Sequence, residues 1–211
     1  MSRDHVLHRV RTALGRGVAQ EAPPAPPARI RIPEVDMEAR VAGLLSGVAA
    51  LAGKTHRAAT PEDARRYVAE AIAGKTAVAS NAPYLAECGI ASLPGVRTGV
   101  TAKDELRALC ATCDVGITSA DYALADTGTL VMISSPREAR MVSLLPPMHI
   151  AVLPRERILT GLDELLSLLP HPAEQTSSMV LITGPSRTAD IEQILVRGVH
   201  GPGQITVVVV G

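Results

Sequence analysis

The sequence predicts an α/β fold with an open, mainly parallel sheet that is covered by helices on both faces. Short apolar stretches recur along the chain, and helical patterns fill most of the gaps between them, which is the alternation typical of such sheets. Ligands of these folds bind at the carboxyl ends of the strands, so we expect the functional site there. The expected strands are 76–80, 96–100, 115–118, 129–134, 150–153, 179–183 and 205–210.

The first 33 residues are expected to form an arm and a linker. Residues 4–15 alternate charged and apolar side chains at helical spacing, and Gly15 and Gly17 follow. Four prolines between Pro23 and Pro27 predict an extended, semi-rigid linker. The arm either docks on a partner or a second copy, or is a frayed terminus. The chain therefore divides into a helical arm at 1–20, a proline-rich linker at 21–33 and an α/β domain at 34–211.

Two helices are expected to open the α/β domain. The first has one apolar helical face and the second, at 61–73, begins with Thr60 as its N-cap and Pro61 at its first position. The apolar face of the first consists of Val41, Leu44, Leu45 and Val48.

Composition restricts the class of partner. Of the 211 residues, 46% are hydrophobic and 20% are charged, which is ordinary for a globular protein. There is no Phe or Trp and there are only three Tyr, so recognition of single-stranded nucleic acid by aromatic stacking is not expected. The 21 basic and 21 acidic side chains balance, so no net field attracts nucleic acid or an anionic membrane. Small molecules or proteins are the expected partners.

The cysteines and the apolar segments bear on cofactors and compartment. No stretch reaches the roughly 20 apolar residues of a membrane span, and the start of the chain lacks a secretory pattern, so we expect a cytoplasmic protein. Cys110, Cys113 and Cys88 fall short of the four thiolates of a typical iron–sulfur cluster, so no cofactor or metal is expected in this chain. Cys110 and Cys113 are either a redox pair or the end of a helix that leads into a strand. No G-x-G-x-x-G follows a strand, so a standard dinucleotide fingerprint is absent.

The stretch 181–203 is the strongest candidate for a binding site. An expected strand ends at Thr183, a loop follows through Gly184 and Ser186, and a helix is expected to begin with Thr188 as N-cap and Asp190 in its first turn. The free N–H groups of such a helix would face anionic or hydroxyl-rich ligands. We therefore expect this loop to bind ligand.

Three further residues of this stretch have two interpretations each. The Arg187 guanidinium suits a two-pronged contact with a carboxylate or phosphate, or forms an ion pair with Asp190 or Glu192. Gly198 is expected to end the helix, after which His200 and Gly201 either contact the ligand or hold the return turn.

A second candidate stretch, 116–134, places two carboxylates near strand ends. Asp121 and Asp126 are each a general base or a hydroxyl-binding group, or else they cap turns by accepting backbone N–H bonds. We assign a catalytic role to Asp126 and ligand contacts to Asp121, Thr127 and Gly128.

The stretch between them, 137–152, supplies three more candidates. Arg140 and Ser143 are three residues apart, so on a helix they share a face on which both contact an anion. His149 opens an expected strand and is either an acid–base group or a core histidine.

These motifs resemble the LUD (lactate-utilisation) domain family over residues 36–211. The resemblance rests on GPSRTADIE followed by GVHGP, on GIT-x-AD with D-T-G-T, and on LPP-x-HI. Asp126 stands where the family pattern has Glu, which shortens the carboxylate by one methylene. The resemblance implies a three-layer α/β/α sandwich of the kind shared by glucosamine-phosphate deaminases, ribose-phosphate isomerases and CoA transferases.

The resemblance also implies a function. It implies an accessory or catalytic subunit of a three-protein system that oxidises L-lactate to pyruvate, with the iron–sulfur clusters in companion subunits. This chain would then bind a small carboxylate or phosphate. The alternatives are a stand-alone sugar-phosphate isomerase or CoA-transferase-like enzyme, for which fold is a poor argument, and a non-catalytic scaffold.

Overall fold

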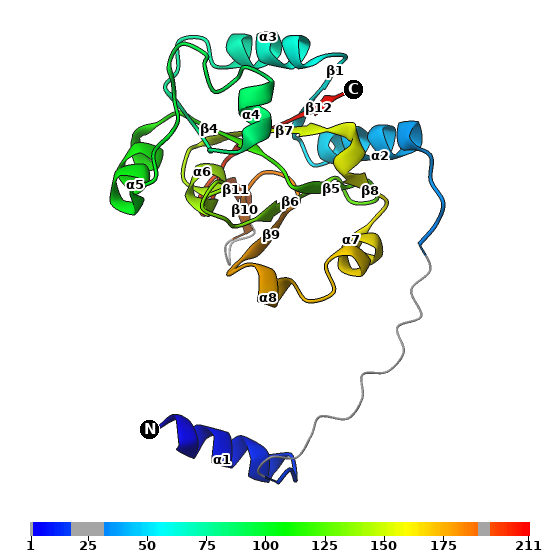
Figure 1. Cartoon of the computed structure of the whole chain (residues 1–211), viewed down its shortest axis with the longest axis vertical. Helices are drawn as coiled ribbons and strands as arrows, with labels where there is room; N and C mark the ends of the chain where they lie inside the picture. Colours follow the sequence, from blue (N-terminus) through cyan, green and yellow to red (C-terminus); the bar gives the residue numbers. More distant parts are fainter. Residues whose placement is uncertain (1, 18–31, 190–194) are drawn as a thin grey trace. The chain divides into compact units, whose positions relative to one another are not determined.

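A computed structural model describes residues 2–17, 32–189 and 195–211 of the chain (Figure 1). Contacts divide the chain into two units, Met1–Arg31 and Ile32–Gly211. The first unit contains α1 (Arg3–Ala13), where Ser2 is the N-cap and accepts from the His5 N–H, and this confirms the expected helix. The expected linker lies for the most part outside the described residues.

The second unit is built on a six-stranded sheet in which every neighbouring pair is parallel, as the sequence predicts. The strand order is β1-β12-β7-β4-β2-β3. The first of these was not expected, because its sequence KTHRA has no apolar run. The strands are β1 (Lys54–Ala58), β2 (Ala77–Ala79), β3 (Val96–Arg97), β4 (Val115–Ser119), β7 (Met148–Pro154) and β12 (Gln204–Val210).

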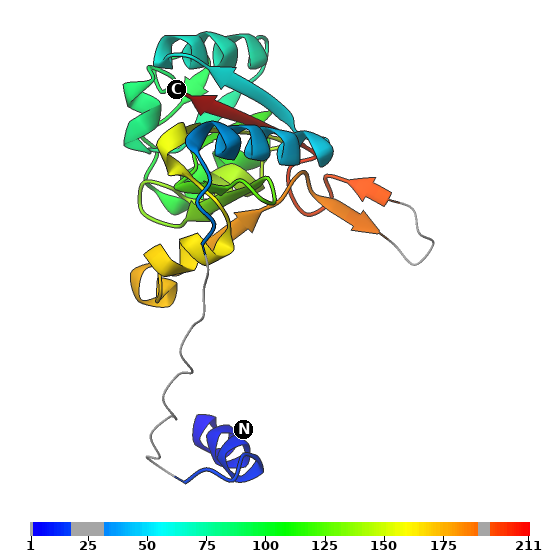
Figure 2. The same cartoon turned by 90° about the vertical axis from the view of Figure 1, so that its right-hand side faces the viewer.

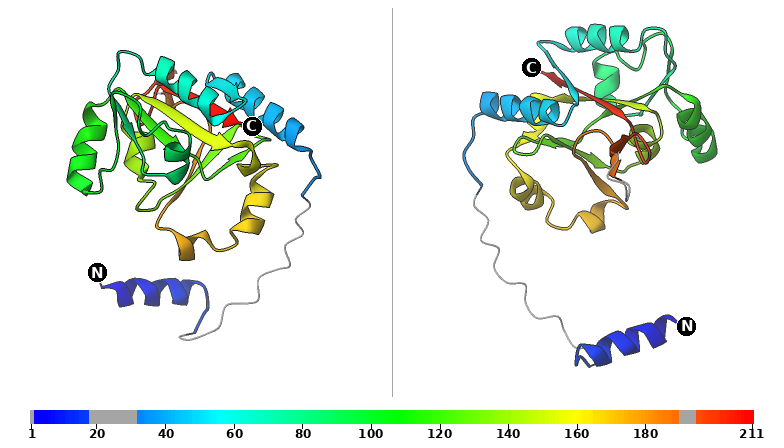
Figure 3. Two further views of the ribbon diagram at one scale, coloured as in Figure 1. Left: turned by 45° about the horizontal axis from the view of Figure 1, so that its top comes forward. Right: turned by 180° about the vertical axis from the view of Figure 1, so that it is seen from behind.

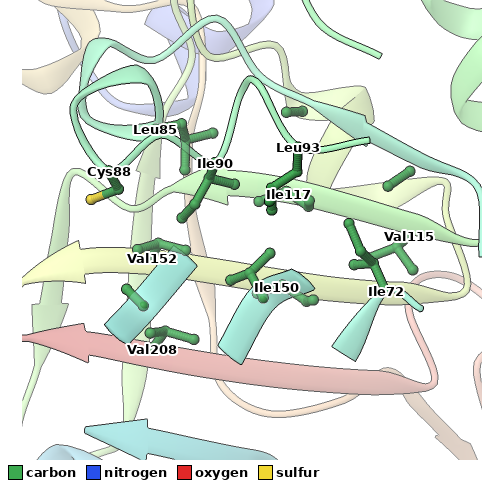
Figure 4. Close-up of a cluster of buried hydrophobic side chains, with 14 of the residues drawn as sticks. Ile72, Leu85, Cys88, Ile90, Leu93, Val115, Ile117, Ile150, Val152 and Val208 are labelled. Carbon is green, nitrogen blue, oxygen red and sulfur yellow. The ribbon is translucent and has the colours of Figure 1, made fainter. Parts of the chain in front are cut away.

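Helices α3 (Pro61–Ala71) and α4 (Pro83–Glu87) cover one face of this sheet. Thr60 caps α3 by accepting from the Asp63 N–H, and Pro61 lies at its start, as expected. Figure 4 shows the core under these helices, in which Ile117, Ile150 and Val208 extend from β4, β7 and β12. Since all three side chains are fully buried and aliphatic, their strands were recognisable as apolar runs.

The other face is covered by α2 (Met37–Ala50), α5 (Lys103–Thr112), α6 (Arg140–Leu144) and a second, smaller sheet. Leu44 of α2 packs with Val207 and Val209 of β12 and with Leu130 of the smaller sheet. In Figure 3, seen from behind, β12 crosses between α3 and α2. The unit is therefore the three-layer α/β/α sandwich that the sequence predicts.

The smaller sheet corrects one expectation. Residues 129–134 and 179–183 were expected in the parallel sheet, but β6 and β9 pair antiparallel in a separate sheet of order β8-β5-β6-β9. An apolar run signals burial without saying which sheet it joins, and the tight turn between β5 and β6 requires an antiparallel pair. The strands are β5 (Tyr122–Leu124), β6 (Thr129–Ile133), β8 (Ile158–Leu159) and β9 (Met179–Ile182).

For the described residues, the helix expected after Thr188 is wrong. Residues Arg187–Ala189 form β10, which pairs antiparallel with β11 (Leu195–Arg197), and the hairpin projects from the body of the unit (Figure 2). Thr188 is thus not a helix cap, and Gly198, with φ of +80°, lies in a turn rather than at a helix end. Ser186 closes the hairpin base through bonds to Pro202 and Gly198, contacts that a local pattern does not reveal. Asp190 and Glu192 lie outside the described residues.

The remaining described elements are short. They are η1, a 3₁₀ turn (Arg155–Arg157), α7 (Leu162–Leu168) and α8 (Pro172–Gln175). In the described part of the chain, no helix has the length and apolar character needed to cross a membrane.

Candidate functional site

Two of the cavities along the segment 135–144, which contains α6, are lined by candidate residues from the sequence. The hairpin-side cavity, of about 210 Å³, lies between α6, β9 and the segment 200–205. The strand-end cavity, also of about 210 Å³, lies where β2, β4 and β7 end. Its polar walls are Tyr84, Glu87, Ser119, Asp121, Ser135, Arg137, Glu138 and Arg157.

Helix α6 brings Arg140 and Ser143 to the hairpin-side cavity, as their spacing predicts. Arg140 is exposed, so its guanidinium keeps its donors for a ligand. Ser143 is buried, and its hydroxyl donates to the Arg140 carbonyl at 3.1 Å. Helix α6 therefore places one cation, Arg140, at the cavity, on a helical turn that is packed through Ser143.

The opposite walls come from the stretch that begins at β9. The N–H of Ser186 donates to the Pro202 carbonyl at 2.9 Å, which brings the chain after β9 against the return turn before β12. Six of the expected ligand-binding residues therefore meet at one cavity. They are Arg140, Thr183, Gly184, Ser186, His200 and Gly201.

Two other expected ligand residues of the stretch 181–203 lie outside the walls of this cavity. The Arg187 guanidinium donates to the carbonyl of Leu51, the C-cap of α2. A cation at that position also interacts favourably with the negative end of a helix. Thr188 pairs with Val196 in the β10–β11 hairpin. For Arg187 the structure thus provides a helix-capping role, and ligand contact by either residue stays a prediction.

A chain of hydroxyl contacts links the two stretches that the sequence singled out. The Thr127 hydroxyl donates to Asp126 Oδ1 at 3.2 Å and lies 2.8 Å from that of Thr129, which is itself 2.8 Å from that of Thr183. Asp126 is exposed in the turn between β5 and β6. Its catalytic role therefore stays a prediction, while its bond with the Thr127 hydroxyl supports a role in holding the turn.

Gly128 lets the same turn lie close against α2. Its φ is +66°, and a Cβ there would lie 2.5 Å from Gly47 C and Val48 N of α2. Backbone atoms of the turn and the helix are in close approach, so the position requires glycine for conformation and for space.

His149 is a core residue. Its side chain is 1% exposed, its Nε2 lies 2.7 Å from the Thr118 hydroxyl, and its Nδ1 has no partner among the described residues. Burial lowers the pKa of His149 to about 4, so the imidazole is neutral at pH 7. His149 is not among the residues that line either cavity, and its acid–base role stays a prediction.

The strand-end cavity occupies the position at which parallel sheets bind ligands. Neighbouring β2 and β4 end next to Ser80 and at Ser119, and the chain leaves them in opposite directions, towards β3 and towards β7. Such a reversal opens a crevice at the carboxyl ends of the two strands.

Glu138 is a buried carboxyl group in this cavity, with only 6% of the residue exposed. Its Oε2 accepts from the Ser80 hydroxyl at 2.8 Å and from the Ser119 N–H at 3.4 Å. Its Oε1 is buried and has no hydrogen-bond partner among the described residues. Burial raises the pKa of Glu138 to about 8, so the group is largely a neutral acid at pH 7.

Arg157 and Asp121 provide opposite charges in the same cavity. Arg157 Nη1 donates to the Ser119 hydroxyl at 3.2 Å and the Ala120 carbonyl at 3.1 Å, and the guanidinium lies 5.4 Å from the centre of the Tyr84 ring. Asp121 Oδ2 accepts from the Ile133 N–H at 2.6 Å, which is the turn-capping alternative for this residue. Burial raises the pKa of Asp121, although the Ile133 N–H and Arg157 act against it.

Glu138, Arg157, Ser80 and Ser119 were not recognised as site residues from the sequence. One signal was available, since Glu138 follows an expected strand within a loop of small residues and Arg157 follows another strand. Asp121, which was expected to bind ligand, is the only member of the predicted set that lines the strand-end cavity.

The three cysteines are free and buried. Burial raises the pKa of each thiol, that of Cys110 to about 11. Cys110 lies in α5 just before Cys113 leads towards β4, so the interpretation as a helix end that enters a strand is confirmed. Within the described ranges there is no group of three or more His, Cys, Asp or Glu side chains that could hold a metal.

Comparison with known families identifies the class of protein. The LUD domain family matches residues 43–210, and the chain belongs to this family. A crystal structure of a DUF162 family protein from Deinococcus radiodurans superposes with a TM-score of 0.63. The superposition covers 84% of this chain and 100% of the Deinococcus radiodurans chain, at 18% sequence identity. It shows that the two chains share a fold.

Similar curated proteins are named lactate utilization protein C. That of Halalkalibacterium halodurans is 43% identical over 101 residues, which cover 46% of this chain and 44% of the relative. Lactate utilization protein C 1 of Bacillus mycoides is 34% identical over 116 residues, which cover 53% of this chain and 50% of the relative. The chain thus spans about half the length of the curated relatives it matches.

Proposed function

We propose that this chain acts in lactate utilisation, as a subunit of a system that oxidises L-lactate to pyruvate with iron–sulfur clusters in companion subunits. The observation that carries the proposal is membership of the LUD domain family together with the name that its similar relatives share. We place the system in the cytoplasm, where a reducing environment suits three free cysteines.

The ligand proposed for this subunit is a small carboxylate in the hairpin-side cavity. Among the described residues that line it, Arg140 and His200 are the titratable ones and none is acidic. A guanidinium without a competing carboxylate favours an anion and can hold a carboxylate by two parallel hydrogen bonds.

The remaining walls of the cavity suit the rest of a small hydroxy acid. Thr183 and Ser186 offer hydroxyl groups, while Leu144 and Ile205 provide an apolar surface for a methyl group. A volume of about 210 Å³ accommodates a ligand of a few heavy atoms. L-lactate has these three features, a carboxylate, a hydroxyl and a methyl group.

Growth of a deletion strain on L-lactate as the sole carbon source tests the proposal. The strain should fail to grow, and the wild-type gene or Arg66→Gln, a change at an exposed arginine on α3, should restore growth. Arg140→Gln should not restore it. Normal growth of the deletion strain would refute the lactate role, and full rescue by Arg140→Gln would refute the assigned cavity.

A second candidate function is a scaffold that recruits the companion subunits through the N-terminal arm. Val6, Val10 and Leu14 in and just after α1 are exposed by 47%, 49% and 61%, and α1 has no buried residue. Deletion of residues 1–27 should then abolish co-purification of iron–sulfur subunits from lactate-grown cells and leave L-lactate binding by the purified chain intact. Unchanged co-purification would exclude the arm as the recruiting element.

Lactate-dependent dye reduction by the purified material distinguishes a subunit from a stand-alone enzyme. Activity should require the co-purified companions. Turnover of a sugar phosphate or a CoA ester by the chain alone would instead support an independent enzyme.

A further inference from the structure

We propose that the strand-end cavity is a second ligand site, which takes a small 2-oxo acid whose carboxylate is held by Arg157 and whose carbonyl oxygen is hydrogen-bonded by Glu138 Oε1. The inference goes beyond the proposed function, because it concerns a different cavity with different residues.

The buried carboxyl group of Glu138 has one oxygen, Oε1, without a hydrogen-bond partner among the described residues. Buried polar atoms are almost always hydrogen-bonded, because an unmatched one loses its water without compensation. Ser80 and Ser119 both donate to Oε2, which fixes the carboxyl group and leaves Oε1 without a partner on the described chain. Glu138 is one of the residues that line the cavity, and in our proposal a ligand atom is the partner of Oε1.

The protonated carboxyl group of Glu138 offers a hydrogen-bond donor at Oε1. A carboxyl group that is neutral at pH 7 can donate its proton in a hydrogen bond, and a ligand carbonyl oxygen accepts one. Burial of Glu138 removes water from its carboxyl group, which favours the neutral form and raises its pKa. The partner that fits Oε1 at neutral pH is therefore an acceptor.

The guanidinium of Arg157 is held in place by its neighbours before any ligand binds. Both of its hydrogen bonds use Nη1, which contacts Ser119 and Ala120. These contacts and the Tyr84 ring fix the plane of the guanidinium, so its remaining donors are oriented without further loss of side-chain freedom. A planar carboxylate is the group that best matches them.

The charges on the cavity walls make anion binding at Arg157 depend on the protonation state of Glu138. Arg137 and Arg157 balance Asp121 and Glu87, so the walls are neutral when Glu138 is protonated and carry one negative charge when it is ionised. An anion therefore binds better while Glu138 holds its proton. No bond is made or broken in this step, because the proton stays on Glu138 and is shared with the ligand oxygen.

Pyruvate binding to the full chain with Arg140→Gln tests the inference, since that change disables the hairpin-side cavity. Binding is followed by NMR through the backbone amides of Ser119 and Glu138. Pyruvate should shift both signals, and acetate, which lacks the carbonyl, should bind more weakly. Adding Arg157→Gln should weaken binding by about tenfold or more, as expected for loss of a charge-assisted hydrogen bond, whereas Arg66→Gln should leave it unchanged.

The pH dependence tests the role of Glu138 separately. Pyruvate affinity should fall as the pH rises from 6.5 to 9.5, and Glu138→Gln, whose amide remains a donor, should bind at both values with little pH dependence. Arg157→Lys, which keeps the charge but not the fork, should be intermediate, and thermal melting establishes that each variant is folded.

Several outcomes would overturn the inference. These are the absence of pyruvate-induced shifts at Ser119 and Glu138, binding that Arg157→Gln does not weaken, acetate binding as well as pyruvate, or an unchanged pH profile in Glu138→Gln. None of them bears on the growth phenotype of Arg140→Gln, so the two proposals can fail independently.

Discussion

The strand-end cavity and the hairpin-side cavity have similar volumes but are built in different ways. The first lies at the carboxyl ends of parallel strands and contains a buried acid, Glu138, held by Ser80 and Ser119. The second lies between a short helix, an edge strand and a turn, and its cation, Arg140, is exposed. In the strand-end cavity the ends of the parallel strands bury an acid. In the hairpin-side cavity surface segments leave a charged side chain accessible.

The largest expected difference is in the pH dependence of stability. The carboxyl group of Glu138 has its pKa raised from 4.5 to about 8, so the folded chain keeps a proton that the unfolded chain loses. Its stabilising contribution is full below pH 4.5 and is lost as the pH rises through 8. Each pKa unit corresponds to about 1.4 kcal/mol, so the free energy of unfolding should lose roughly 4 kcal/mol over this range through Glu138.

Urea denaturation of wild type and Glu138→Gln at a series of pH values measures this contribution. The difference between the two proteins should follow the Glu138 titration, and Arg140→Gln should keep the wild-type slope. An equal slope in wild type and Glu138→Gln would mean that the acid is not buried as described.

His149 should give the next largest effect, with the opposite sign. Burial lowers the pKa of His149 from 6.5 to about 4, so the unfolded chain binds a proton that the folded chain does not. Its contribution is present above pH 6.5 and is lost as the pH falls towards 4, by roughly 3 kcal/mol. His149→Gln should remove this acid sensitivity in the same denaturation series, and its persistence would assign the effect to other groups.

Gly116→Ala should disturb the segment that both cavities share. A Cβ at Gly116 in β4 would lie 1.9 Å from the carbonyl oxygen of Val142 in α6, so the helix must move. We expect a loss of about 2 kcal/mol in unfolding free energy, together with weaker ligand binding at the hairpin-side cavity. Gly17→Ala, whose Cβ would meet no atom of the described residues within 4 Å, is the control, and equal stability of both variants would contradict the close packing of α6 on β4.

Thr129→Val should have the smallest effect. The change removes the hydroxyl that contacts both Thr127 and Thr183, and it should cost about 1 kcal/mol of unfolding free energy. Thr112→Val is a control, since that hydroxyl bonds only to carbonyls of its own helix. A larger loss in the control, measured by denaturation, would show that the hydroxyl chain does not hold β6 to the end of β9.

Much of the central sheet was predictable because its strands are buried on both faces. Residues 115–118, 150–153 and 205–210 form nearly uninterrupted apolar runs, and they became β4, β7 and β12. Residues 187–189 and 195–197 were misassigned, because bonds between Ser186 and both Pro202 and Gly198 close a hairpin base there.

The candidate site was predictable in part for a similar reason. Arg140, Ser143 and Thr183 lie in motifs that the sequence displays, and they meet at the hairpin-side cavity. Glu138 was not recognised, because what distinguishes it is burial against Ser80, a residue 58 positions earlier in the chain. The pairing of β2 with β4 places Ser80 near Ser119, and the Asn81 N–H donates to the Arg137 carbonyl at 2.8 Å, which holds the segment of Glu138 at the end of β2.

A crystal structure of the full chain soaked with pyruvate tests the central claim, that the chain contains two separate sites for small carboxylates. We expect pyruvate in both cavities, with one carboxylate on Arg140 and the other on Arg157, and with the second molecule's carbonyl oxygen at Glu138 Oε1. Pyruvate in only one cavity would contradict the claim of two sites, and its absence from both would contradict the assignment of either.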